Sequence, residues 1–238
     1  MRAKDSVEWF LHHATEFDSL YQKSKDFQER FDAWSKVIDK YSTPNQYALD
    51  VGCGSGIFSF YLAQRSDSVL AIDGSAEMLK ICKEKQEKSG LKNIDFKQYD
   101  IYELSRVLSK KRKADIIVCS SVLEYVDDLG KAINILSSLL KRRGVLIFSM
   151  PNRSSIYRKI EPIIYRYYRL TRRHHYYRYV KNVCTLDQMK EKVKNYNLTI
   201  IESDYYAATW LLSMVCRKIG LRTYSDNLFL AVAQRSNK

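Results

Sequence analysis

Proline and glycine are scarce in this sequence, with 3 and 8 residues among 238. Their scarcity leaves little room for disordered linkers, and the chain contains no internal repeat or low-complexity tract. None of the five cysteines forms a C-x-x-C pair, and an odd number at scattered positions indicates free thiols in a reducing compartment. We therefore predict a single domain over residues 1–238.

A long hydrophobic run is also missing. The longest stretch that is apolar and nearly uncharged, residues 207–216, is about half of the roughly 20 residues that a membrane-spanning helix needs. The first five residues contain no apolar segment of a secretory signal. We expect a cytoplasmic protein that is at most peripheral to the inner face of a membrane.

Acidic residues are nearly absent from one segment of this basic chain, whose net charge is +13. Residues 151–181 hold nine Lys or Arg and seven Tyr, but one acid, Glu161. Such a segment is suited to anionic lipid headgroups, to a small phosphorylated or carboxylated molecule, or to RNA. A solvated basic helix with buried tyrosine rings is the plainest alternative, and the sequence leaves all four open.

Strand-like and helix-like segments alternate along the chain. Helical periodicity covers the first 45 residues. Apolar strands are predicted at residues 47–51, 68–72, 94–98, 114–120, 145–150, 198–205 and 227–234. Helices are predicted between them at residues 57–65, 76–89, 129–141 and 185–196, the last with Thr185 as its N-cap.

This order predicts an α/β fold with a seven-stranded, mostly parallel sheet, helices on both faces and an N-terminal helical cap at residues 1–45. The last two strands complete the sheet and are expected to be antiparallel. Right-handed crossovers place the carboxyl ends of the parallel strands at one edge. Ligands of such sheets bind at that edge.

A glycine-rich segment, D-V-G-C-G-S-G at residues 50–56, joins the first strand to a helix. Glycines let a ligand approach the backbone closely and supply unusual dihedral angles. A dinucleotide-binding fingerprint needs glycine or alanine at the next position, where Ile57 stands. The segment therefore predicts a ligand site at the carboxyl edge; its spacing departs from that fingerprint, but a glycine-rich turn alone leaves a dinucleotide open.

Two further acids belong to the same edge. Asp73 ends the second strand and can accept hydrogen bonds from both hydroxyls of an adenosine ribose. Asp100 follows the third strand and can accept a hydrogen bond from an adenine amino group. Met78 and Ile101 supply apolar surface for the faces of the ring.

The motif L-D-V-G-C-G-S-G at residues 49–56, followed by these acids, resembles the class I S-adenosylmethionine-dependent methyltransferases, which have a Rossmann-like fold. The resemblance is close over residues 45–150 and loose over the whole chain. It implies a cofactor-binding core at residues 46–150, an acceptor region at residues 151–238, S-adenosylmethionine as cofactor and S-adenosylhomocysteine as product. The core residues that we assign to the cofactor are Asp50, Gly52, Gly54, Asp73, Met78, Asp100, Ile101 and Ser120.

The sequence F-S-M-P-N-R at residues 148–153 is similar to a segment of the ubiquinone-biosynthesis O-methyltransferases. In that subfamily an arginine upstream of the glycine motif contacts the cofactor, and Arg30 is the matching candidate, suited to the carboxylate of the methionine end. Metal-binding members carry E-x-x-E-H after the fourth strand. Ser121, Glu124 and Tyr125 stand at these positions, so we predict no metal.

These features predict methyl transfer to a small amphipathic or anionic acceptor, with oxygen as the favoured acceptor atom and peripheral contact with an anionic membrane as an accompanying expectation. His174 and His175, in the basic segment, are the candidate general bases. The alternatives are an RNA methyltransferase, against which no N-P-P-Y-like tetrapeptide follows the fourth strand, and a protein that binds the cofactor without transferring a methyl group.

Overall fold

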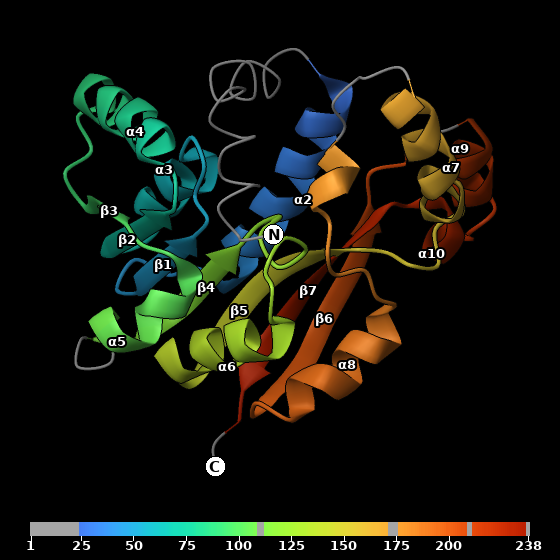
Figure 1. Cartoon of the computed structure of the whole chain (residues 1–238). Coiled ribbons are helices and arrows are strands. Elements are labelled where there is room, and N and C mark those ends of the chain that lie inside the picture. The colour runs from blue at the N-terminus through green and yellow to red at the C-terminus, as the bar shows by residue number, and fades with distance from the viewer. Residues whose placement is uncertain (1–23, 109–111, 171–175, 209–210, 237–238) are drawn as a thin grey trace.

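One sheet organises the protein, as the computed structural model shows for residues 24–108, 112–170, 176–208 and 211–236 (Figure 1). Its strands are β1 (Tyr47–Val51), β2 (Ser68–Asp73), β3 (Ile94–Gln98), β4 (Ala114–Cys119), β5 (Leu140–Pro151), β6 (Leu198–Tyr206) and β7 (Leu228–Arg235). They pair in the order β3-β2-β1-β4-β5-β7-β6. Strands β1 to β5 are parallel, whereas β7 runs antiparallel to both β5 and β6. The predicted fold class is confirmed.

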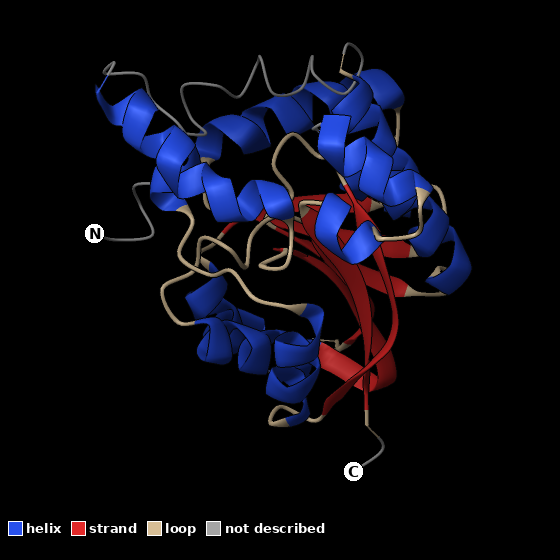
Figure 2. Cartoon of the chain, turned by 90° about the vertical axis from the view of Figure 1, so that its right-hand side faces the viewer, coloured by secondary structure: helices blue, strands red, loops and turns tan. Residues whose placement is uncertain are grey.

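Helices cover both faces of the sheet, so that the strands lie between two helical layers (Figure 2). Helices α5, α6 and α8 share a hydrophobic core with one face, and α2, α3 and α4 share a core with the other. Their bounds are α2 (Lys25–Tyr41), α3 (Ile57–Ala63), α4 (Ala76–Ser89), α5 (Leu104–Leu108), α6 (Leu129–Leu139) and α8 (Leu186–Lys194). Neighbouring residues of β4, Ile116 and Ile117, are both fully buried, one in each core, which explains why the central strands are apolar without alternation.

Local sequence signals fix several helix starts. Thr185 caps α8 as predicted: its side chain accepts from the backbone N–H of Gln188, whose side chain in turn accepts from the Thr185 N–H. Asp128 and Ser75 cap α6 and α4 through their side chains alone, each of which accepts from the backbone N–H of the third residue of its helix. These caps satisfy backbone donors that the first turn of a helix leaves without partners.

Helix α2 forms the described part of the predicted N-terminal cap. Trp34 and Ile38 are fully buried against the sheet, and the indole N–H of Trp34 donates to the Tyr206 hydroxyl on β6 at 3.3 Å. This packing fixes the register of the helix. Arg30, about one turn before Trp34, is thereby brought to the carboxyl edge of the sheet.

The region after residue 150 departs most from the predicted pattern. Three helices, α7 (Ile156–Leu170), α9 (Leu211–Lys218) and α10 (Arg222–Ser225), gather at one corner of the molecule, on the right of Figure 1. Short 3-10 turns, η1 (Ile101–Glu103) and η2 (Tyr176–Tyr179), were also not predicted. Strand β5 begins at Leu140, so the helix predicted at residues 129–141 ends at Leu139. In the described residues, no helix has the length and apolar character needed to cross a membrane.

An ion-pair network ties this corner to the N-terminal helix. Arg217 on α9 pairs with Glu29 on α2 and with the fully buried Asp226 after α10, the latter at 2.8 Å. Glu29 also accepts from the backbone N–H of Ala207 at 3.3 Å. Helix α9 and the residue after α10 are therefore anchored to the same helix that carries Arg30.

Candidate functional site

A pocket opens at the carboxyl ends of β1, β2 and β4, where ligands of parallel sheets bind. All nine residues that the sequence assigned to the cofactor lie in its wall. They are Arg30, Asp50, Gly52, Gly54, Asp73, Met78, Asp100, Ile101 and Ser120. They come from α2, β1, β2, α4 and the turns after β1, β3 and β4, so the fold unites residues that are up to 90 positions apart along the chain.

The glycine-rich turn forms the floor of the pocket. Gly52, Gly54 and Gly56 all have positive φ, at 73°, 53° and 84°. A Cβ on Gly52 would lie 2.1 Å from Val122 Cγ2, whereas a Cβ on Gly54 would meet no atom within 4 Å. Gly52 is therefore required by packing inside the protein, and Gly54 leaves open space that a ligand can fill.

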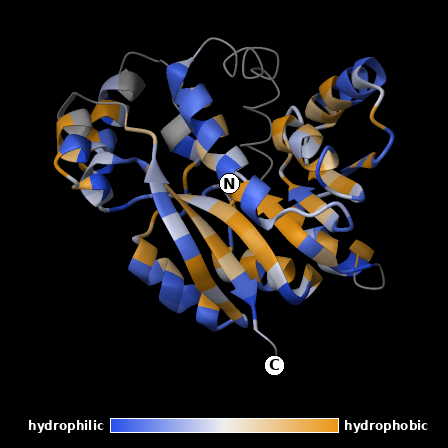
Figure 3. Cartoon of the chain, turned by 180° about the vertical axis from the view of Figure 1, so that it is seen from behind, coloured by the Kyte–Doolittle hydropathy of each residue, from blue (hydrophilic) through white to orange (hydrophobic). Residues whose placement is uncertain are grey.

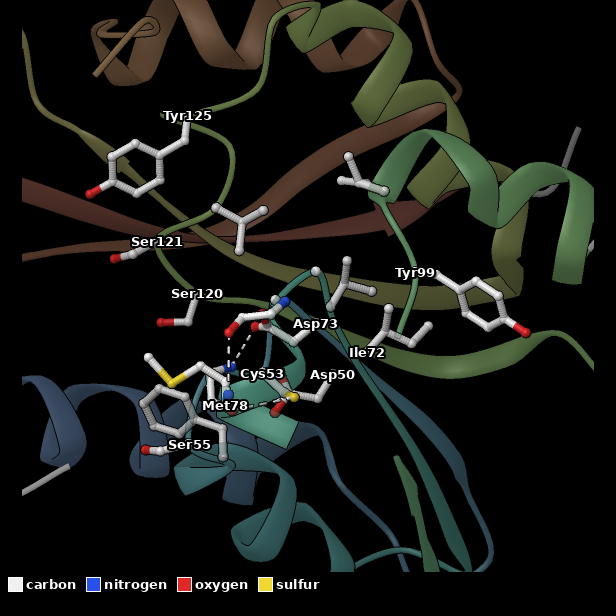
Figure 4. Close-up of a pocket in the computed structure, with 18 of the residues that line it drawn as sticks. Asp50, Cys53, Ser55, Ile72, Asp73, Met78, Tyr99, Ser120, Ser121 and Tyr125 are labelled. Atoms are coloured by element: carbon white, nitrogen blue, oxygen red, sulfur yellow. Dashed lines mark hydrogen bonds between the residues drawn. The ribbon is translucent and has the colours of Figure 1, made fainter. Parts of the chain in front are cut away.

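Asp73 braces this turn from the end of β2 (Figure 4). Its carboxylate accepts hydrogen bonds from the backbone N–H groups of Gly54 and Ser75, each at 2.8 Å. Burial raises the pKa of Asp73, and these backbone hydrogen bonds oppose that shift. A carboxylate held this way has further lone pairs for donors on a ligand, such as ribose hydroxyls.

Asp50 is more deeply buried than Asp73 and contacts a helix behind the pocket. It is 1% exposed and accepts a hydrogen bond from the Ser59 hydroxyl on α3 at 2.6 Å. Burial raises its pKa to about 7, against the effect of the Ser59 hydrogen bond and with a contribution from the charge of Asp73. Asp50 therefore links the glycine-rich turn to the helix that follows it, from the inner wall of the pocket.

The far end of the pocket combines apolar and acidic groups. Met78, at the start of α4, is 2% exposed, and Ile101 is 9% exposed. Asp100 caps η1, since its carboxylate accepts from the Tyr102 N–H at 2.8 Å while Glu103 accepts from the Asp100 N–H. Tyr99 also lines this end (Figure 4); the sequence prediction did not include it, although it directly precedes Asp100.

Arg30 and Ser120 meet at the opposite end. The Arg30 guanidinium donates to the Ser120 hydroxyl at 2.6 Å. A guanidinium in a pocket wall provides a positive charge and a planar set of donors for a carboxylate. This end of the pocket is therefore suited to the amino-acid part of a ligand whose adenosine part contacts Asp73 and Asp100.

The sequence assignment omitted four residues of the segment after β4 that line the pocket: Ser121, Val122, Tyr125 and Val126. Figure 4 shows the hydroxyls of Ser120, Ser121 and Tyr125 directed toward the same side of the pocket. Ser121 has a φ of 54°, a region that a residue with a side chain seldom adopts. The sequence assigned Ser120 of this segment to the cofactor. The directions of the side chains that follow depend on the backbone conformation of Ser121, which the sequence did not indicate.

Tyr125 stands where the resembling enzymes have a histidine. Burial raises its pKa above the usual range of a phenol, so it remains a neutral donor at physiological pH and is a poor proton acceptor. The predicted bases His174 and His175 lie outside the described residues. Within the described ranges, no three His, Cys, Asp or Glu side chains are grouped to hold a metal ion.

Comparison with known proteins agrees with this geometry. A family model described as a methyltransferase domain matches residues 42–218, most of the chain. The chain belongs to this family. The match covers the glycine-rich turn and extends through α7 and α8 to the end of α9.

Two relatives are named ubiquinone biosynthesis O-methyltransferase. The one from Actinobacillus pleuropneumoniae serotype 5b is 38% identical over 108 residues, which cover 44% of this chain and 46% of the relative. The one from Marinobacter nauticus is 34% identical over 118 residues, covering 50% and 49%. The chain spans about half the length of the curated relatives it matches.

Solved structures share the fold at low identity. Magnesium protoporphyrin IX methyltransferase from Synechocystis PCC 6803, with bound S-adenosylhomocysteine, has a TM-score of 0.66 at 20% identity and covers 89% of this chain and 84% of its own. The N-methyltransferase NodS from Bradyrhizobium japonicum, also with S-adenosylhomocysteine, has a TM-score of 0.66 at 17% identity and covers 99% of both chains. The predicted family and Rossmann-like fold are confirmed, and these findings agree with S-adenosylmethionine as the cofactor.

Proposed function

We propose that this protein transfers a methyl group from S-adenosylmethionine to an oxygen of a small amphipathic or anionic acceptor. The observation that carries the proposal is the pocket itself. It unites an open glycine cradle at Gly54, a braced carboxylate at Asp73 and a guanidinium at Arg30. These groups match the backbone, ribose and carboxylate contacts that an adenosylated amino acid requires.

The cofactor supplies a methyl carbon that its sulfonium has already activated for displacement. The protein therefore has two tasks, which are to align the acceptor with that carbon and to remove the acceptor's proton. Alignment can contribute roughly 7–11 kcal/mol to lowering the barrier. A positioned base adds about 10²- to 10⁴-fold in rate.

The relatives support oxygen as the acceptor atom. Those cited above are named O-methyltransferases, and they match this chain at 34–38% identity over about half of their length. Because the match is partial, the acceptor of this protein is inferred from its own surface as well. In the region after residue 150, that surface combines exposed apolar side chains with exposed cations.

The corner formed by α7, α9 and α10 supports an amphipathic acceptor and contact with an anionic membrane. Six of the seven large apolar side chains that are exposed in the described residues lie on or beside these helices: Ile163, Tyr167, Val215, Ile219, Leu221 and Tyr224. Ile163 and Ile219 are the most exposed, at 71% and 67%. Orange and blue segments alternate over this corner, on the left of Figure 3.

The charges of the same helices favour an anionic surface. Lys159, Arg166 and Lys218 are exposed, whereas Glu161 on α7 and Asp226 after α10 are fully buried, and the exposed Asp204 is paired with Arg222. Glu161 is neutralised by Arg158 through contacts at 2.9 and 2.6 Å. Exposed apolar side chains among exposed cations are typical of a surface that contacts anionic lipid, with each cation contributing about 1 kcal/mol near a charged membrane.

A screen with S-adenosylmethionine labelled in the methyl group tests the proposal. Phenols, catechols, lipid extracts and RNA serve as acceptors, and the label is counted after organic extraction. We expect transfer into organic-soluble phenolic products and none into RNA. Label in RNA would replace the proposal with the RNA methyltransferase. Binding of S-adenosylhomocysteine without transfer to any acceptor would leave a cofactor-binding protein.

A further inference from the structure

A buried carboxylate lies directly behind the acceptor side of the pocket. Glu124 is 3% exposed, and its Oε2 atom is buried without a hydrogen-bond partner. Leaving a charged acceptor atom in this state costs on the order of 1–3 kcal/mol or more. Such a group persists in a folded protein when it has a role that a satisfied or apolar side chain does not perform.

Glu124 is connected to the pocket through Ser121. Ser121 lines the pocket three residues before Glu124 in a turn of the chain, and its hydroxyl lowers the pKa of the Glu124 carboxyl. The backbone N–H of Ser121 donates to the Ser149 hydroxyl at 3.0 Å, which holds the residue in its left-handed conformation. Ser120, in contrast, already accepts the Arg30 hydrogen bond. Ser121 is therefore the hydroxyl that joins the pocket to a buried carboxylate.

We propose that Ser121 and Glu124 form a proton relay that receives the proton of the methyl acceptor's hydroxyl. This inference rests on the proposed function, which requires such a proton acceptor. The acceptor hydroxyl donates to Ser121 Oγ, and the Ser121 hydroxyl proton passes to the Glu124 carboxylate. As the new oxygen–carbon bond forms, the sulfur–carbon bond breaks and its electron pair stays on sulfur, so that the products are a methyl ether, a thioether and a protonated Glu124.

The surroundings of Glu124 suit a group that changes its charge in each cycle. Burial raises its pKa to about 7, while the positive charges of Arg30 and Arg158 and the Ser121 hydroxyl oppose that shift. A proton acceptor with a pKa near physiological pH is effective at taking and releasing a proton. The titratable and charged groups that face it are Arg30 on α2, Cys119 on β4, Tyr125, Arg158 on α7 and Tyr206 on β6.

The backbone around Glu124 also holds it firmly. Its carbonyl accepts from the backbone N–H groups of Lys181 and Asn182, at 2.8 and 3.0 Å. The Asn182 side chain donates to the carbonyls of Leu123 and Val126, at 3.0 and 2.7 Å. Lys181 and Asn182, at the end of the basic segment, are thus hydrogen-bonded to the backbone on both sides of Glu124. A rigid support of this kind keeps a proton-transfer geometry within the narrow limits that it needs.

The test measures binding of a phenol to the protein saturated with S-adenosylhomocysteine. Calorimetric titrations with 3,4-dihydroxybenzoate are made at pH 6 and pH 8. We expect about tenfold tighter binding at pH 8 in the wild type, because the ionised carboxylate makes Ser121 the better acceptor. Glu124→Gln and Ser121→Ala should each weaken binding at pH 8 by about tenfold and remove the pH dependence.

Matched controls separate the relay from a structural effect. Glu87→Gln removes an exposed carboxylate on α4, outside the pocket wall, and should behave as the wild type. 3,4-Dimethoxybenzoate, which has no hydroxyl, should bind wild type and Glu124→Gln alike. Thermal unfolding and S-adenosylhomocysteine titrations verify that both relay variants are folded.

The outcomes distinguish this inference from the proposed function. A wild type that does not bind S-adenosylhomocysteine overturns the proposed function. If it binds S-adenosylhomocysteine, but the phenol does not bind, or binds Glu124→Gln as tightly as the wild type at both pH values, the relay alone is overturned.

Discussion

Residues 46–150 and residues 151–238 contribute to the same sheet but differ in the regularity of their elements and in the groups that they expose. In the first region the strands and helices alternate regularly, and the carboxyl edge offers backbone and carboxylates to a ligand. In the second, helices α7, α9 and α10 leave large apolar side chains in solvent among cations. Under the proposed function, the first region holds the cofactor, and the second region contacts the acceptor and its surroundings.

Substitution of Gly52 should cause the largest loss of affinity for S-adenosylhomocysteine, and it should disturb the structure of residues 46–150 only. Its Cβ would overlap Val122 at 2.1 Å, so Gly52→Ala displaces either the turn or the segment after β4. We expect affinity for S-adenosylhomocysteine to fall roughly 100-fold or more, measured by calorimetry. Gly90→Ala is the control, because Gly90 has a similar φ of 69° but open space around it. Equal losses in the two variants would assign the effect to backbone strain.

Loss of the Asp73 carboxylate should have the next largest effect. Asp73→Ala removes the acceptor for Gly54 and Ser75 N–H groups as well as the expected ribose contact. Hydrogen bonds to a charged group are each worth about 1.5–3 kcal/mol, so affinity for S-adenosylhomocysteine should fall by roughly 10- to 100-fold. Asp95→Ala on β3, which removes an exposed carboxylate, should leave it unchanged. Unaltered binding by Asp73→Ala contradicts the cofactor assignment.

The smallest effect is expected from the surface of the second region. Ile163→Ser combined with Ile219→Ser should weaken binding to vesicles of phosphatidylglycerol and phosphatidylcholine by roughly tenfold in a sedimentation assay. Affinity for S-adenosylhomocysteine should stay the same, because neither residue lines the pocket. Ile201→Ser, on β6, removes an exposed isoleucine away from the corner and is the control. An equal loss with Ile201→Ser would show general hydrophobic adsorption instead of a defined surface.

Prediction from sequence succeeded where a local rule and the tertiary environment agree. Helix α4 has the predicted bounds because Ser75 caps it and Gly90, in the left-handed conformation, ends it. Strands β1 and β3 also have the predicted bounds: β1 is a short, mostly buried run, and in β3 the buried Ile94 and Phe96 alternate with exposed residues. At α7 the sequence left several interpretations open, a basic helix among them, because Pro162 and the many tyrosines and arginines obscure the periodicity of a helix that buries Glu161.

By itself, the sequence determined the fold class, the glycine-rich turn and the identity of nine pocket residues, because these depend on periodicity and on short motifs with fixed spacing. Tertiary structure decided which groups meet. The Arg30–Ser120 contact joins residues from α2 and the end of β4, and Glu124 acquired its buried position only when α2, α7 and the Lys181–Asn182 segment packed around it. Burial and long-range electrostatics arise from packing, so neither is encoded in local spacing.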